Sequence, residues 1–437
     1  QSRQRKQPPG SKMKRIAVIG AGVIGVTTAW YLRRQGFEVT VYERQAGPAL
    51  ATSAGNAGII APGYVTPWAA PGMPGKLASY LLAPASPIVF RPALAPAQWR
   101  WIARWLAQCT PPRYRRNRER MQRLARYSRE CLHALRAETG IEDNGRTGYL
   151  QLFRTAADVE SNGPARRMLD DQGVRYQLLD AAGARLREPA LRADTPLAGA
   201  LYLPDDESAD CQLFTQRLAE RAAAAGVVFV YGRDVATIRQ EAGRVTGLLL
   251  SRQRIAEPNR VACDGVVVAA GPHAGTLLQR FGIDLPIYPI KGFSATLPLL
   301  PGAEPPRQAL MDETYKTAIT PLGSTLRIAG TAEIGNRTLR LRPRALNTLR
   351  KVAGDWFGDR FDLAAARYWV GARPMTPDGP PLLGKTAIGG LFVNVGHGST
   401  GWAMSCGSAA VIADLIACRP PELDLDGLTL ARLAERA

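Results

Sequence analysis

The N-terminal part of the sequence combines two short apolar runs with a helical pattern, within residues 14–44. Residues 16–19 predict a buried strand, and residues 28–34 predict a helix that ends at Gly36. A second apolar run at 39–42 predicts another strand. A strand, a helix and a strand in this order predict a βαβ unit with parallel strands.

Further along the chain, strand-like and helix-like patterns alternate. Strands are expected at 147–154, 227–231, 261–271 and 391–395 and within 286–335, and helices at 211–225, 343–357 and 401–417. Residues 61–98 are rich in Pro, Ala and Gly and are expected to be irregular. This alternation predicts an α/β fold: a discontinuous Rossmann-like domain interrupted by an α+β domain with a mixed or antiparallel sheet. We place 14–75, 200–285 and 371–437 in the first domain, and 76–199 and 286–370 in the second.

The segment 96–138 is predicted to be largely helical. An apolar stripe lies opposite a polar face, with Trp101, Ile102, Trp105, Leu106 and Cys109 on the stripe and Arg100, Arg104 and Gln108 opposite. Pro111 and Pro112 end this helix. Residues 113–129 hold eight arginines and one glutamate, and we expect them on a long helix that reaches about Glu138.

A glycine-rich turn, Gly20-Ala21-Gly22-Val23-Ile24-Gly25, joins the first strand to the first helix. Gly20 makes the tight turn, Gly22 lets the backbone approach a pyrophosphate, and Gly25 lets the helix pack on the strand. The helix N-terminus offers N–H groups and a positive dipole end to phosphates. Glu43 ends the second strand, 18 residues after Gly25, and can accept hydrogen bonds from ribose hydroxyls. Together these features predict a dinucleotide site.

Size and composition narrow the class of protein. A chain of 437 residues, 46% hydrophobic and 21% charged, is typical of a globular protein with two domains. The six cysteines are scattered and the three histidines do not pair at ligand spacing, so we expect no metal and a cytoplasmic enzyme with reduced thiols. Residues 1–13 are interpreted as a tail or tag that ends at a native start, Met13.

The formal net charge of +19 suits either nucleic acid or an anionic membrane surface. No nucleic-acid-binding motif accompanies the charge, so we expect no nucleic acid partner. Trp99, Trp101 and Trp105 precede the arginine-rich segment, and indole rings and arginines both favour lipid headgroups. One hypothesis is that residues 80–130 dock on the inner face of the cytoplasmic membrane. The alternative is a solvated helix whose apolar stripe is buried in the core.

With these motifs in place, the sequence resembles the small-subunit family of bacterial D-amino acid dehydrogenases, within the glycine oxidase and D-amino acid oxidase group of flavoproteins. The resemblance runs from Lys14 to about Ala417. Its markers, besides the glycine-rich turn, are NAGIIAPGYVTPWAAPG (56–72), DCQLFTQRLAERA (210–222), YPIKGFSATLP (288–298), YKTAITP (315–321), RIAGTAE (327–333), GARPMTPDGPPLLG (371–384) and GHGSTGWAMSCGS (396–408). It implies FAD, held non-covalently, rather than NAD.

The resemblance also implies substrate-binding residues. Arg373 corresponds to the arginine that binds the substrate carboxylate in this group, and a guanidinium can hold a carboxylate through two parallel hydrogen bonds. Tyr64 and Tyr315 are candidates for the pocket, with packing in the core as the alternative for each. Lys291 and Lys316 are further candidates for anchoring substrate or for flavin electrostatics.

The FAD contacts implied by the resemblance come from several separated segments. In the first βαβ unit and after it they are Val18, Gly20, Ala21, Gly22, Val23, Ile24, Gly25, Glu43, Arg44, Ser53, Asn56 and Ala57. Later in the chain they are Val235, Ala270, Gly271, His397, Gly398, Thr400 and Gly401. A helix that starts near Gly401 would stabilise negative charge on reduced flavin. For His397, a structural role is the alternative to a flavin contact.

The function implied by the resemblance is oxidative deamination of D-amino acids to 2-oxo acids and ammonia, by hydride transfer to FAD. No general base stands out, and none is needed if a neutral amine loses hydride. Electrons would pass to a quinone or another respiratory acceptor. The alternatives are an oxidase acting on glycine, sarcosine or D-hydroxyproline, and a flavin-carrying chain that needs an additional subunit.

Overall fold

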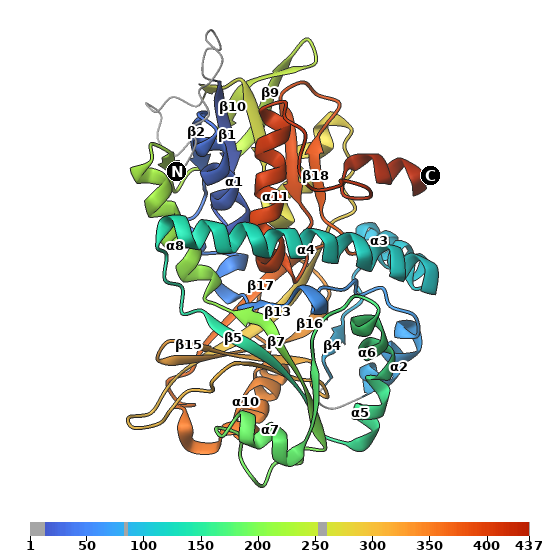
Figure 1. Ribbon diagram of the computed structural model, residues 1–437. Helices are drawn as coiled ribbons and strands as arrows, with labels where there is room; N and C mark the ends of the chain where they lie inside the picture. Colours follow the sequence, from blue (N-terminus) through green and yellow to red (C-terminus); the bar gives the residue numbers. More distant parts are fainter. Residues whose placement is uncertain (1–13, 83–85, 252–259, 437) are drawn as a thin grey trace.

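The computed structural model describes residues 14–82, 86–251 and 260–436, so the tail or tag proposed for residues 1–13 lies outside the described residues. Figure 1 shows two layers of structure, one around β1, α1 and α11 and the other around β5, β7 and β13. The long helix α4 (Pro111–Thr139) crosses the molecule between them (Figure 1).

The first layer is built on a six-stranded sheet in the order β18-β19-β12-β1-β2-β8. Its strands are β1 (Arg15–Ile19), β2 (Glu38–Tyr42), β8 (Val228–Val230), β12 (Gly265–Val268), β18 (Leu382–Lys385) and β19 (Leu391–Val395). All neighbours pair in parallel except β18 and β19. Helix α1 (Val23–Arg34) contacts both α8 (Cys211–Ala224) and α11 (Gly401–Ile416). The predicted Rossmann-like fold class is confirmed.

The second layer is a large mixed sheet in the order β17-β13-β16-β15-β14-β5-β7-β3. Its strands are β3 (Ile59–Ile60), β5 (Arg146–Phe153), β7 (Gly199–Ser208), β13 (Tyr288–Pro298), β14 (Ala309–Asp312), β15 (Thr317–Leu322), β16 (Thr325–Ile334) and β17 (Arg367–Met375), with β4 (Ile88–Phe90) beside β16 and β6 (Gln177–Asp180) beside β7. Most neighbours are antiparallel, and α10 (Pro343–Phe357) packs on β13 and β16.

The remaining elements connect or flank these sheets. A small antiparallel sheet contains β9 (Val235–Glu241), β10 (Arg244–Leu250) and β11 (Arg260–Ala262). The other helices are α2 (Met73–Leu82), α3 (Pro96–Gln108), α5 (Ala156–Ser161), α6 (Gly163–Asp170), α7 (Ala181–Arg187) and α9 (Ala274–Leu278), and the 3₁₀ turns are η1 (Thr52–Gly55), η2 (Pro62–Tyr64), η3 (Gly271–His273), η4 (Gln279–Phe281), η5 (Gly358–Arg360) and η6 (Leu430–Arg436). Among the described residues, no helix is both long and apolar enough to span a bilayer.

Two local predictions differ from the structure. Residues 61–98 are expected to be irregular, but they contain α2 and β4. The proline in α2, Pro74, is its second residue, and proline is compatible with the first turn of a helix. The strand expected at 261–271 is divided between β11 and β12, which belong to different sheets. Two strands of the large sheet come from segments proposed for the first domain. Residues 200–208 lie in β7, which pairs with β5, and residues 371–375 lie in β17, which pairs with β13. The division into domains stays a proposal.

The aromatic and arginine-rich segment is only partly exposed. Trp101 and Trp105 are 5% and 8% exposed on the inner face of α3, which for these two residues agrees with the stated alternative of an apolar stripe buried in the core. They lie one turn apart on the buried face, whereas Trp99 lies outside it. On α4, Arg118 and Arg120 are buried too, so the arginine-rich stretch is not a uniformly solvated face.

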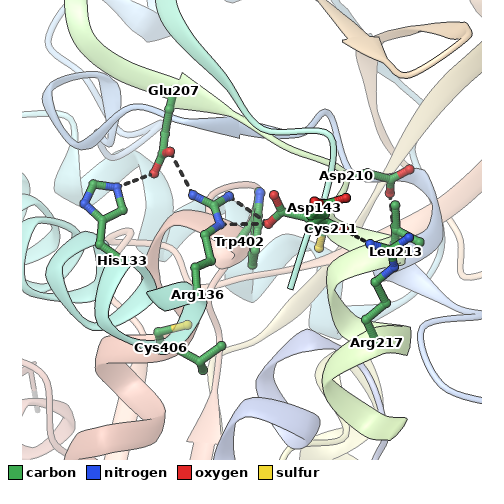
Figure 2. A network of polar contacts seen from close by, with 12 residues as sticks. His133, Arg136, Asp143, Glu207, Asp210, Cys211, Leu213, Arg217, Trp402 and Cys406 are labelled. Atoms are coloured by element: carbon green, nitrogen blue, oxygen red, sulfur yellow. Dashed lines mark hydrogen bonds and ion pairs between the residues drawn. The ribbon is translucent and has the colours of Figure 1, made fainter. Parts of the chain in front are cut away.

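A network of polar contacts holds α4 to both layers (Figure 2). Arg136 on α4 donates to Asp143 at 2.8 and 2.9 Å and to Glu207 of β7 at 2.8 Å. The carbonyl of Asp143 in turn accepts a 2.8 Å hydrogen bond from the backbone N–H of Asp210. Asp210 caps α8 through hydrogen bonds from Gln212 and Leu213. One partly buried arginine, Arg136, therefore links the large sheet to the helices of the nucleotide-binding layer.

Close packing between β1 and α1 depends on glycine. A Cβ added at Gly25 would lie 1.8 Å from the carbonyl oxygen of Gly20. Gly20 itself has φ of +105°, and a Cβ there would lie 2.7 Å from the carbonyl oxygen of Ala269. These clashes are with backbone atoms, so they cannot be relieved by a side-chain rotation, and the roles predicted for Gly20 and Gly25 are confirmed.

We expect Gly25→Ala to lower the free energy of unfolding by about 3 kcal/mol, because helix and strand must separate to admit the Cβ. The control is Gly354→Ala in α10, where an added Cβ meets nothing within 4 Å. The control should be neutral or stabilising by up to about 1 kcal/mol. Urea unfolding measures both, and equal effects would contradict the packing argument.

Candidate active site

The predicted nucleotide residues gather at the carboxyl ends of three parallel strands. The glycine-rich turn follows β1, Glu43 follows β2, and Ala270 and Gly271 follow β12. In open α/β sheets, ligands bind at this edge. The backbone N–H of Ala21 donates to Glu43 Oε2 at 2.7 Å, so the carboxylate lies directly against the turn.

The start of α1 has the features of a phosphate site. Its first turn contains no acidic residue. The backbone N–H of Val23 donates to Ser53 Oγ at 3.0 Å, and a Cβ on Gly22 would lie 3.3 Å from the same oxygen. Ser53, from η1, is therefore held at the N-terminus of α1, where backbone N–H groups and the helix dipole favour an anion.

Two further predicted contacts flank this edge. Arg44 and His273 lie 2.7 Å apart, which connects the end of β2 to the turn after β12. Burial, together with the charge of Arg44, lowers the pKa of His273, which favours the neutral ring. Val235 is buried at the start of β9. Roles for Arg44 and Val235 toward an adenine nucleotide stay predictions.

A cavity of about 450 Å³ lies between these turns and the large sheet. This volume falls within the range typical of small-molecule sites, roughly 300–1,000 Å³. Of the sequence-predicted residues, those that line it are Asn56, Ala57, Tyr64, Lys316, Arg373, Gly398 and Thr400. The structure therefore brings predicted flavin contacts and the predicted carboxylate-binding arginine together in one space.

Arg373 is the central charged group of the cavity. It lies on β17 opposite Ile290 of β13, and its guanidinium lies over Gly292, where a Cβ would be 2.4 Å from the guanidinium carbon. One of its nitrogens donates to the Lys291 carbonyl at 3.3 Å, and its guanidinium lies 5.7 Å from the Trp68 ring. Burial lowers its pKa to about 10, which keeps it charged at neutral pH. Within the described residues, no carboxylate lies within ion-pair distance of it.

Trp369 is a cavity residue that sequence reasoning missed. It lies two positions before Gly371 and four before Arg373, so all three share one face of β17. A Cβ on Gly371 or on Gly55 would lie 2.0 Å from the Trp369 ring. The indole therefore rests on two glycines, one from each layer. In the sequence, the spacing of Trp369, Gly371 and Arg373 at every second position already indicated that Trp369 shares the face of the strand that carries Arg373.

The two tyrosines have different surroundings. The Tyr64 hydroxyl donates to Glu313 Oε1 at 3.4 Å, and burial raises its pKa, so it stays protonated. Tyr315 does not line the cavity. Its ring packs in the core beside Arg154, whose guanidinium lies 4.9 Å from the ring centre. This is the core-packing alternative stated for Tyr315, and we do not carry it into the site.

The two lysines are both paired with carboxylates. Lys291 is buried and forms an ion pair with Glu333, on the opposite side of β13 from Gly292. Lys316 lines the cavity and contacts Glu313. Because each lysine already contacts a glutamate, neither is the best partner for a substrate carboxylate. This leaves Arg373 as the favoured partner.

The imidazole of His397 is buried and contacts other side chains of the protein. Its Nε2 lies 3.1 Å from Ser408 Oγ, and that hydroxyl donates its proton to the Ser405 carbonyl at 3.0 Å. His397 must therefore donate, which places its proton on Nε2. Gly398 and Thr400 line the cavity, while Gly401 starts α11. The segment thus faces the cavity through residues 398–400 rather than through the imidazole.

Comparison with known proteins identifies the family. The family model for FAD dependent oxidoreductase, DAO, matches residues 15–415. The chain belongs to this family. It is 46% identical over 420 residues to a D-amino acid dehydrogenase of Rhodopseudomonas palustris (strain HaA2), covering 96% of this chain and 97% of the relative. It is also 46% identical over 425 residues to one of Xanthobacter autotrophicus, covering 97% and 100%.

Solved structures give the same fold. Glycine oxidase from Geobacillus kaustophilus matches with a TM-score of 0.72 and 24% identity, over 96% of this chain and 99% of that one. L-proline dehydrogenase from P. horikoshii matches with a TM-score of 0.73 and 18% identity, over 97% and 99%. At this identity the likeness concerns the fold alone.

The residues of this member of the FAD-dependent family fit its cofactor. The glycine cradle at Gly20, Gly22 and Gly25 leaves backbone where a side chain would fill the space. Glu43 lies beside it, where its carboxylate would meet ribose hydroxyls, and the first turn of α1, which has no acidic residue, would face the phosphates. Asn56 and Thr400 line the cavity that a flavin ring would enter.

The neutral state of His397 predicts part of the acid sensitivity of the enzyme. Burial lowers its pKa to about 3, whereas an unfolded histidine titrates near ~6.5. As pH falls from 6.5 toward 3, the unfolded state takes up a proton that the folded state does not, so stability decreases over that window. We expect His397→Asn to be less stable at pH 7 but to lose roughly 2 kcal/mol less between pH 7 and 4.5. Urea unfolding at both pH values tests this, and parallel losses would contradict a neutral buried His397.

Proposed function

We propose that this enzyme is an FAD-dependent D-amino acid dehydrogenase that converts D-amino acids to 2-oxo acids and ammonia. The observation that carries the proposal is Arg373, a cavity-lining guanidinium without a carboxylate partner among the described residues. The names of the relatives, at 46% identity over nearly the whole chain, support the substrate class.

Arg373 would bind the substrate carboxylate through two parallel hydrogen bonds, which fix the angle of the amino acid as well as its distance. Gly292 leaves room for the guanidinium, and the Lys291 carbonyl holds one of its nitrogens. Orientation of the reacting carbon is the main contribution that such a protein makes to hydride transfer.

The cavity would position the substrate and exclude water from it, but it offers no strong base among the described residues. No carboxylate and no histidine side chain is among the residues that line it in the described part of the chain. Bound FAD supplies the two-electron acceptor. Once the substrate amine is neutral, its lone pair can form the C=N bond as hydride leaves Cα, and water then hydrolyses the free imine to the 2-oxo acid and ammonia.

The test is an anaerobic spectrum of FAD-loaded protein before and after adding D-alanine or L-alanine. We expect D-alanine to bleach the flavin and L-alanine to leave it oxidised. Arg373→Met should lower the second-order rate constant of reduction about 100-fold or more, because a charge-assisted bidentate contact is lost. Arg367→Met, on the same strand but exposed, is the matched control and should change it little.

Reduction by the L-enantiomer, or an Arg373→Met variant with wild-type rates, would contradict the proposal. If D-alanine reduces the flavin bound to this chain without any other protein, the alternative in which an additional subunit is required is excluded. In the presence of oxygen, stoichiometric peroxide formation at the rate of turnover would favour the oxidase alternative.

The electron acceptor we propose is a quinone in a membrane with anionic lipid. The support is an exposed surface at α3, which we call the α3 surface. It comprises Leu94, just before the helix, and Trp99, Arg100 and Leu106 on it. Trp99 and Leu106 are exposed two turns apart on one face of α3, and Arg100 is exposed beside them. Apolar side chains flanked by arginine suit an anionic interface.

Flotation with liposomes tests the α3 surface. We expect binding to vesicles that contain anionic lipid and little binding to neutral ones. Trp99→Ser combined with Arg100→Glu should weaken binding at least about tenfold, since each arginine near such a surface contributes ~1 kcal/mol. Arg146→Glu, an exposed arginine at the start of β5, is the charge-matched control. Binding that does not depend on anionic lipid would contradict the hypothesis.

A further inference from the structure

The cavity extends along an apolar wall whose role the carboxylate site does not explain. We call this wall the aromatic arm and define it by Met73, Ile88, Trp101, Trp105 and Ile334, all of which line the cavity. Trp101 and Trp105 are buried and stacked, with ring centres 6.5 Å apart and planes at 12°. Trp68 packs against the same cluster and lies beside the Arg373 guanidinium, so the arm begins next to the carboxylate site.

The arm is held at a fixed position relative to Arg373. The indole N–H of Trp101 donates to the backbone carbonyl of Met375 at 2.9 Å. Met375 lies two residues after Arg373 on β17. Trp101 also packs against Tyr288 at 5.8 Å, and Tyr288 pairs with Met375 across the sheet. Helix α3 is thereby tied to the strand that would bind the carboxylate, which fixes the spacing between the two subsites.

The charges of the cavity select against ionised side chains. Among the described residues that line it, the charged ones are Arg373 and Lys316, and Lys316 contacts Glu313. A basic substrate side chain would therefore find no carboxylate in the arm, and an acidic one would be buried against apolar atoms. An ionised group that is desolvated without a partner is strongly disfavoured, whereas an apolar side chain gains free energy by covering these walls.

We propose that the aromatic arm is the subsite for the substrate side chain and that it selects bulky apolar or aromatic D-amino acids, with Trp105 as a specificity-determining residue. This inference rests on the proposed function, because it needs Arg373 to hold the carboxylate. D-Phenylalanine, D-leucine and D-methionine are the substrates of this class, and D-alanine is too short to fill the arm.

The first experiment measures kcat/KM of the FAD-loaded enzyme with a dye acceptor and a series of D-amino acids. We expect D-phenylalanine, D-leucine and D-methionine to exceed D-alanine by about tenfold or more, and D-lysine and D-aspartate to fall below D-alanine. A preference for D-alanine or for a charged substrate would overturn the inference and leave the proposed function intact. If no D-amino acid reduces the flavin, the proposed function itself fails.

Variants in α3 test whether the arm sets the preference. Trp105→Leu should lower kcat/KM for D-phenylalanine about tenfold while changing D-alanine less than about twofold, because only the longer side chain contacts this wall. Arg104→Leu, on the exposed face of the same helix and outside the α3 surface, is the control and should change neither. An equal loss for both substrates in Trp105→Leu would overturn the inference.

Binding of substrate analogues gives a readout that does not require turnover. 3-Phenylpropionate and propionate correspond to phenylalanine and alanine without the amino group. We expect 3-phenylpropionate to raise the unfolding temperature more than propionate, and Trp105→Leu to remove that difference. If Trp105→Leu instead changes KM for a soluble quinone and leaves both amino acids and both analogues unaffected, the arm serves the electron acceptor and the inference is overturned.

Discussion

A cavity-lining guanidinium with no carboxylate partner among the described residues is the constraint around which this site is organised. Burial lowers the pKa of Arg373 to about 10, which reflects the cost of taking its charge out of water. The Lys291 carbonyl and the Trp68 ring offset that cost only in part. The fold must therefore hold β17 in place with contacts that Arg373 itself does not provide. A bound carboxylate would supply the missing partner, so ligand binding and stability of the site are coupled.

The contacts that hold β17 also connect it to the nucleotide turn. Thr52 Oγ1 donates to the Ala372 carbonyl at 2.9 Å, next to Arg373, while its neighbour Ser53 accepts from Val23 at the start of α1. Two consecutive residues thus contact the strand of the carboxylate site and the helix of the phosphate site. Trp369 reinforces the same junction by resting on Gly55. The small residues of this segment are needed because a larger side chain at Gly55 would displace the indole.

The sequence was most informative where the determining contacts are local. The need for Gly25 follows from a backbone clash with Gly20, five residues away. The helix predicted at 343–357 agrees with α10 at both ends because Pro343 starts it and Gly358 ends it. Non-local contacts explain what was missed. Whether Tyr315 faces the cavity or the core is decided by Arg154, which is distant in sequence. Likewise, β7 and β17 joined the large sheet through pairing that no local pattern reveals.

The pairing of charges around the cavity explains why one arginine is left for a ligand. Lys291 would compete for a carboxylate, but it lies on the other face of β13 with Glu333, and Lys316 contacts Glu313. His397 is held neutral by burial and donates to Ser408, so it adds no charge to the segment 398–400 that lines the cavity. Arg373 therefore defines the direction in which a carboxylate binds, and a ligand with one carboxylate and a neutral side chain compensates it. A second carboxylate or a cationic side chain would leave a charge unmatched in the same enclosed space. The arrangement that makes Arg373 costly in the free protein is thus the arrangement that makes it selective.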